Sequence, residues 1–200
     1  MALIGLKHIV AAPIDTDNEA AYGEEPNYKT GMVITRGISL STTYNREEKE
    51  FYADDGLAEN DNSTVSSDIS ITGAEFTPEA RVMCFGDVAA KEDSVDVFYK
   101  SAEMSPYMGV GYVTSDVRNG VRTYYGNWVH KMQFGLQDDN AQTRSKSSDW
   151  QSVTVKGKGF PIFLNKAKKV VPGMYARFTE ENGGEAAAIA WVAAKAHITA

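Results

Sequence analysis

YMGVGYVTSDV (residues 107–117), RNG (118–120) and VRTYYGNWVHKMQFGL (121–136) follow one another in this chain of 200 residues. The first run carries apolar residues on both parities, as a strand in a core does. The return run places large apolar side chains on one face: Tyr124, Trp128, Met132, Phe134 and Leu136. Asn119-Gly120 suits a type I′ turn, in which both central residues need positive φ. The stretch therefore predicts a β-hairpin.

Alternation with a period of two extends to both sides of this hairpin. Apolar and polar residues alternate in residues 32–44, 65–72 and 95–99, which predicts strands with two different faces. Further strands are expected at residues 150–157, 160–164 and 173–179.

Two segments predict helices instead. Thr77-Pro78-Glu79 supplies a capping hydroxyl, a proline for the first helical position and an acid in the first turn. This pattern predicts a helix from Pro78 to Phe85 that stops at Gly86. Residues 185–198 are rich in alanine, with Ile189, Val192 and Ala196 at helical spacing. A helix is our prediction there, with a strand through Ile189, Trp191 and Ala193 as the alternative.

These elements predict a mainly β fold, a β-sandwich or partly closed antiparallel barrel, with one short flanking α-helix and a second helix at the C-terminus. We expect a single domain over residues 1–200, since no linker or repeat divides the chain. Residues 1–30 are expected to form an N-terminal arm, because residues 11–29 are polar and rich in turn formers. Residues 44–63 are expected to form a long acidic loop, and residues 137–149 a second loop.

Composition limits the class of protein. Hydrophobic residues make up 42% of the chain and aromatic residues 10%, which argues against disorder. No apolar run approaches the roughly 18 to 20 residues of a membrane span, and residues 1–7 lack the features of a secretory signal. We expect a protein made and kept in a cytoplasm, with no membrane partner. Cys84, the single cysteine, is expected to be a buried core residue.

Charge is unevenly distributed along the chain. The net charge of −7 argues against a protein that binds nucleic acid tightly. Residues 44–62 carry seven acids and two bases, whereas residues 156–169 carry five lysines and no acid. The simplest interpretation of each charged group is a solvent-exposed surface. In a self-associating protein, the opposite charges would instead meet across subunit contacts.

The sequence offers no pattern typical of an enzyme or a cofactor site. It lacks a Gly-x-Ser-x-Gly elbow and a HExxH pair, and its three histidines are scattered. Asp15-x-Asp17-x-Glu19 begins like a calcium loop, but Ala20 replaces the required glycine. His130 is expected to be a structural histidine with its hydrogen bonds satisfied. Gly109 and Gly111 are expected to allow close packing within a strand. We therefore expect no catalytic activity, no metal and no cofactor.

The segment Phe51–Glu59, FYADDGLAE, resembles the "YADDG-x-A-E" segment of the phi13-like family of phage major tail proteins. Other pieces follow in the order of that family, and the resemblance covers roughly residues 3–165. These pieces are Gly5-Leu6-Lys7, Ala21-Tyr22-Gly23, Gly109-Val-Gly111-Tyr112, Arg122-Thr123-Tyr124-Tyr125 and Trp150.

The resemblance implies a virion structural protein. Six subunits would form a ring, and rings would stack into the tube of a long, non-contractile tail. The expected partners are other copies of the chain, the tape-measure protein inside the tube, and the tail-terminator and tail-tip proteins at its ends. Phage DNA would pass through without being bound specifically. The protein would occur in the phage tail, and in the cytoplasm of the bacterial host during assembly.

Two charged groups are the candidate contacts between subunits and rings. We expect the acidic segment to reach the adjacent ring, with its aromatic residues as anchors, and the lysines to face the tube exterior or a subunit contact. An acidic or neutral channel wall would let DNA slide. The candidate residues are Arg46, Glu47, Glu48, Lys49, Glu50, Phe51, Tyr52, Asp54, Asp55, Leu57, Glu59, Lys156, Lys158, Lys166, Lys168 and Lys169.

Three alternatives stay open at this point. The chain could be another ring of the tail or neck, such as a tail terminator or the tube of a contractile system. It could be a β-sandwich module that binds carbohydrate or peptide, with Tyr107, Tyr112 and Tyr125 lining a groove, although packing on strand faces is our preferred interpretation of these tyrosines. An enzyme of unknown type is the third.

Overall fold

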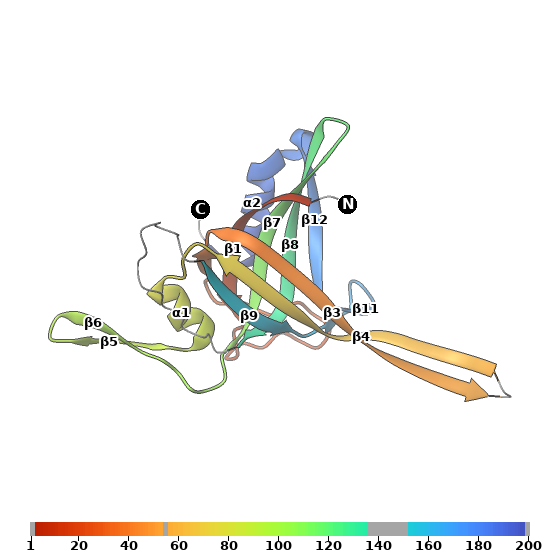
Figure 1. Ribbon diagram of the computed structural model, residues 1–200, viewed down its shortest axis with the longest axis horizontal. Helices are drawn as coiled ribbons and strands as arrows, with labels where there is room; N and C mark the ends of the chain where they lie inside the picture. Colours follow the sequence, from red (N-terminus) through yellow and green to blue (C-terminus); the bar gives the residue numbers. More distant parts are fainter. Residues whose placement is uncertain (1–2, 54–55, 136–151, 199–200) are drawn as a thin grey trace, which may run out of the picture.

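The computed structural model describes the backbone of residues 3–53, 56–135 and 152–198, and it describes side chains outside residues 3–4 and 47–63. The fold is mainly β, built from antiparallel sheets and two α-helices (Figure 1). The predicted fold class is therefore confirmed.

One large antiparallel sheet forms the body. Its strand order is β2-β1-β7-β8-β9-β4-β3, and β12 pairs with β8 beside this path. Only Arg36 separates β2 from β3, so the first and last strands of this order are neighbours in the chain. The sheet brings them together by curling into a partly closed barrel (Figure 1). The bounds of these strands are β1 Leu3–Pro13, β2 Met32–Thr35, β3 Gly37–Ala53, β4 Gly56–Gly73, β7 Tyr107–Arg118, β8 Val121–Phe134, β9 Val153–Gly159 and β12 Gly173–Thr179.

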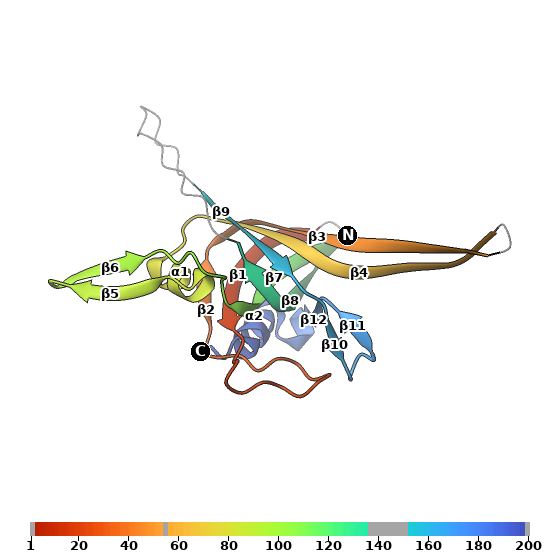
Figure 2. The same cartoon turned by 90° about the horizontal axis from the view of Figure 1, so that it is seen from below.

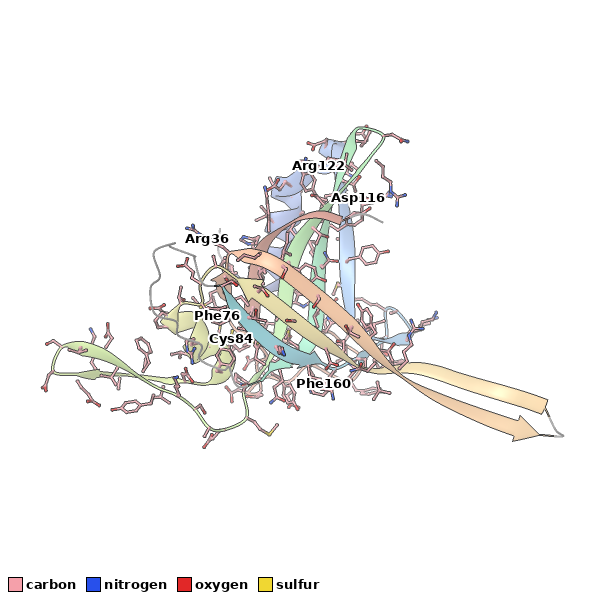
Figure 3. All side chains as sticks on the ribbon, viewed as in Figure 1. Arg36, Phe76, Cys84, Asp116, Arg122 and Phe160 are labelled. Atoms are coloured by element: carbon pink, nitrogen blue, oxygen red, sulfur yellow. The ribbon has the colours of Figure 1, made fainter. Side chains whose placement is uncertain are left out.

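The first of two cores lies within the curl of the sheet. It takes side chains from six strands, among them Ile9, Ile71 and Met132. The helix α1, Pro78–Phe85, packs Cys84 and Phe85 against it; Cys84 is labelled in Figure 3. The helix begins and ends as predicted: the Thr77 hydroxyl accepts a hydrogen bond from the Ala80 amide at 3.2 Å, and Gly86 has a φ of 76°. Cys84 is buried as expected, and burial raises the pKa of its thiol.

The second core lies on the outer face of the sheet, under the C-terminal helix. After a 3-10 turn at Glu180–Asn182, the helix α2, Gly184–Lys195, packs Ala188 and Val192 against Trp128 on β8. A side chain at Gly111 would lie 2.6 Å from both Trp128 and Val192, so glycine there permits the close approach of sheet and helix. The predicted C-terminal helix is confirmed, and the alternative strand is excluded.

The prediction of an N-terminal arm over residues 1–30 is wrong for residues 3–13, whereas the turn-rich residues 15–27 contain no strand, as expected. Leu3–Pro13 form β1, which pairs with β2 on one side and β7 on the other. Ile9 and Ala11 belong to the inner core, whereas Val10 and Ala12 belong to the outer one. A strand buried on both faces has no apolar–polar alternation, so its pattern gives no period of two.

The acidic segment 44–63 is not a loop either. Strands β3 and β4 pair from Gly37 opposite Gly73 to Ala53 opposite Gly56, with register shifts near Arg46 and Phe51. Beyond the body, the two strands continue as a long two-stranded arm, which we call the β3–β4 arm and define as residues 46–64 (Figures 1 and 2). The charged residues concealed the strand, because acids and lysine are poor strand formers.

Two short hairpins complete the fold. One consists of β5, Val88–Glu92, and β6, Val95–Tyr99, and it projects from the end of the molecule opposite to the β3–β4 arm (Figures 1 and 2). The other consists of β10, Ile162–Leu164, and β11, Lys169–Val171. The strand predicted at 173–179 matches β12, the one at 160–164 contains β10, and the one at 150–157 is displaced to β9. The loop predicted at 137–149 lies outside the described residues.

Candidate interaction surface

The β3–β4 arm is the most extended part of the described chain. Within the described backbone, residues 46–53 pair with residues 56–64 and with no other strand, because β9 pairs with β4 only from Ser67 onward. At about 3.3 Å per residue, the strand from Arg46 to Ala53 extends roughly 25 Å. The arm contains the candidate residues of the acidic group from Arg46 to Tyr52 and from Leu57 to Glu59, whereas Asp54 and Asp55 lie outside the described residues.

The structure divides the five candidate lysines between two elements. Lys156 and Lys158 are exposed on β9, within the large sheet. Lys166 and Lys168 are exposed at the turn between β10 and β11, and Lys169 is the exposed first residue of β11, in a separate two-stranded sheet. The interpretation of residues 156–169 as a single patch is therefore corrected to two positive surfaces.

The two lysines of β9 belong to a groove of about 490 Å³ on the outer face of the sheet. Across the strands, Lys156 lies opposite Ser70 of β4, and Lys158 lies opposite Asp68. Ser41 and Thr43 of β3 continue the same row of short polar side chains. The groove therefore combines short polar side chains and two ammonium groups with apolar lining from Ile69 and Phe134.

Asp68 is the acid nearest in register to these lysines, but its carboxylate is held by another residue. It accepts a hydrogen bond of 2.8 Å from the Asn45 side-chain amide. Within the described part of the chain, neither Lys156 nor Lys158 has a carboxylate in ion-pair distance. Both lysines are exposed, so a partner can reach their ammonium groups.

Three strands of the body have only one neighbour in the described backbone. β2 pairs only with β1, β3 only with β4, and β12 only with β8. On β12, Tyr175 is 72% exposed. Such open edges present backbone N–H and C=O groups that can pair with another chain.

The described residues contain no group of three or more histidines, cysteines or carboxylates that could hold a metal. His130 is fully buried, but the prediction of satisfied hydrogen bonds is wrong, because neither ring nitrogen has a partner. Two charged groups act on the pKa of His130, Glu25 and Lys195, and they form an ion pair of 2.5 Å with each other. Sequence analysis did not single out this pair, since its members lie far apart in the chain.

The three tyrosines considered for a binding groove pack individually. Tyr107 meets Phe160 edge to face at a centroid distance of 5.8 Å, and Tyr125 meets Tyr175 at 6.2 Å. Of the three, only Tyr112 lines a pocket described here, one of about 100 Å³. Packing on strand faces, the preferred interpretation, agrees with these contacts.

Within the residues described, no helix is long and apolar enough to cross a membrane. No known family model matches the chain, and no curated protein is similar to it. Its function is therefore inferred from the surface itself and from the resemblance carried by the arm.

Proposed function

We propose that this chain is a virion structural protein, the subunit of hexameric rings that stack into the tail tube of a long-tailed phage. The observation that carries the proposal is the β3–β4 arm. The segment that resembles the tail proteins, Phe51–Glu59, occupies the end of this arm, away from the body.

Two physical properties of the arm favour its association with a partner. An isolated two-stranded hairpin is marginally stable in water at best. The arm also concentrates charge of one sign, so its docking on a positive surface would relieve repulsion between its acids. Association of like subunits supplies both contacts, and the open edges of β3 and β12 offer further pairing sites.

The same proposal assigns the other partners. The tube would enclose the tape-measure protein, carry a tail terminator and tail-tip proteins at its ends, and conduct DNA without binding it specifically. The net charge of −7 suits a conduit, because an acidic wall does not retain phosphates. No cofactor and no catalytic step are required of the chain.

Electron microscopy of the purified protein at several concentrations, together with mass measurement in solution, tests the proposal. We expect rings with sixfold symmetry and, at higher concentration, tubes of constant diameter. Rings of another subunit number would contradict the hexamer. Single rings that never stack would favour a tail terminator, and a protein that stays monomeric even with preformed tail tips would contradict the proposal altogether.

A further inference from the structure

The groove on β9 and the β3–β4 arm are complementary in charge. The groove presents Lys156 and Lys158 without described carboxylate partners. The arm carries seven acids and two bases between residues 46 and 62. Opposite potentials that face each other across an interface steer association and fix its register.

The arm cannot reach the groove of its own chain. The groove is lined by residues of β3 and β4 that still belong to the body, such as Thr43 and Asp68. The arm begins beyond them and runs straight outward for roughly 25 Å (Figure 1). An arm that occupies the groove must therefore come from another molecule.

We propose that the groove around Lys156 and Lys158 is the docking site for the acidic β3–β4 arm of a second copy of this chain. This inference rests on the proposed function and names the surface on which it depends. The contact joins two different surfaces, the arm of one copy and the groove of the next. Each bound copy thus still offers a free arm or a free groove, which is the geometry of rings and filaments rather than of closed dimers.

Charge reversal on each side tests the docking in the full-length chain. K156E/K158E reverses the groove, and E47K/E50K applies the opposite change to the arm. The docking proposed here takes Lys166 and Lys168 out of the candidate contacts, so K166E/K168E, with the same change of charge on exposed lysines of the β10–β11 turn, is the matched control. Sedimentation velocity measures the concentration at which half of the protein is assembled, and circular dichroism checks that each variant is folded.

We expect K156E/K158E and E47K/E50K to raise this concentration at least about tenfold, and K166E/K168E to change it less than about threefold. An equimolar mixture of the two impaired variants should assemble again. In it, the acidic arm of K156E/K158E meets the intact groove of E47K/E50K, and the nearly neutral arm of E47K/E50K, with five acids and four bases, meets the reversed groove.

Normal assembly of K156E/K158E while the wild type forms tubes would overturn the docking site and leave the proposed function standing. Failure of the mixture to assemble would overturn it too. A wild type that never associates would overturn both proposals. Duplex DNA retained at 0.15 M salt by the wild type, and lost in K156E/K158E, would reassign the groove to phosphate and overturn the inference.

Discussion

The imidazole of His130 has an environment that disfavours its charged form. The ring is fully buried, and neither nitrogen has a hydrogen-bond partner. Burial is the main cause that lowers its pKa; Glu25 from the loop before β2 raises the pKa, and Lys195 from α2 lowers it. A buried polar group without a partner costs roughly 1–3 kcal/mol. Its neighbourhood includes Tyr28, whose hydroxyl donates to the His130 carbonyl at 2.8 Å.

This histidine makes stability depend on pH. The pKa of His130 in the folded state lies below its ordinary value of 6.5. The unfolded chain therefore binds a proton that the folded chain does not, once the pH falls through about 6.5. The free energy of unfolding should decrease from pH 7.5 toward pH 5, by at most about 1.4 kcal/mol per pH unit for this group.

Urea unfolding of wild type and His130→Met at several pH values checks the prediction. The variant should keep its stability at pH 7.5, because an apolar side chain replaces an unsatisfied polar one. Its slope with pH should be smaller but not zero, since burial also lowers the pKa of His8. His197→Gln, at an exposed position, is the control and should keep the full slope. Equal slopes in wild type and His130→Met would contradict the assignment.

Single residues differ in how far their sequence context predicts them. Thr77 and Cys84 behave as predicted, because a cap and a small residue in an apolar run are local properties. His130 does not behave as predicted, because the hydrogen bonds of its ring depend on which side chains other elements place beside it. The loop and α2 bring Tyr28, Glu25 and Lys195 near it, and none of them satisfies its nitrogens.

Among the elements, the β5–β6 hairpin projects from the body much as the β3–β4 arm does. One of its faces carries Val88, Val95 and Tyr99, each about half exposed or more. Neither core, as the described residues define them, includes a side chain from β5 or β6. Its base is closed by Asp87, whose carboxylate accepts a hydrogen bond of 3.0 Å from the Ser101 amide. The hairpin is thus an appendage whose base is fixed independently of its strands.

Removal of this hairpin should leave the body folded. Val88 and Tyr99 are direct partners across the hairpin, so Asn-Gly can replace residues 89–98 as a two-residue turn between them. We expect a loss below about 1 kcal/mol, or a fall in Tm of less than about 4 °C. Ile71→Ala, in the inner core, calibrates the assay and should cost about 2–5 kcal/mol. A shortened chain that fails to fold would show that the hairpin supports the body.

Local signals account for the elements that the sequence predicted. Caps and turn residues placed α1 and the β7–β8 hairpin, and helical spacing placed α2. β1 was missed because both of its faces are buried from Ile9 to Ala12, and the arm strands were missed because charges replace the alternation. Both strands therefore depend on their contacts with other elements rather than on a local sequence pattern. β1 is covered on both faces, whereas the arm strands pair only with each other in the described backbone.

At the scale of the whole molecule, the charged residues of the candidate surface could be predicted, but not their arrangement. Net charge along the chain separated an acidic from a basic group. The division of the lysines between β9 and the β10–β11 turn depends on the pairing of β9 with β4, which joins segments far apart in sequence. The groove exists only because of that pairing, so no local pattern could indicate it.

The arm also contains an aromatic pair, Phe51-Tyr52, within its acidic sequence. Charge steers association, but buried aromatic side chains commonly dominate the energy of an interface. Phe51→Ala/Tyr52→Ala should therefore yield a folded subunit that no longer polymerises. The body should keep its Tm, because the arm pairs with no other strand of the described backbone. Electron microscopy and sedimentation velocity of the purified variant measure the effect.

The β5–β6 hairpin offers a matched control, because it carries the same dipeptide at Phe98-Tyr99. Phe98→Ala/Tyr99→Ala removes the same side chains from the opposite end of the molecule (Figure 1). It should assemble like the wild type, since the segment that resembles the tail proteins lies in the arm. Equal loss in both variants would mean that assembly depends on exposed apolar surface in general. Normal tubes from Phe51→Ala/Tyr52→Ala would refute the role of the arm as an anchor.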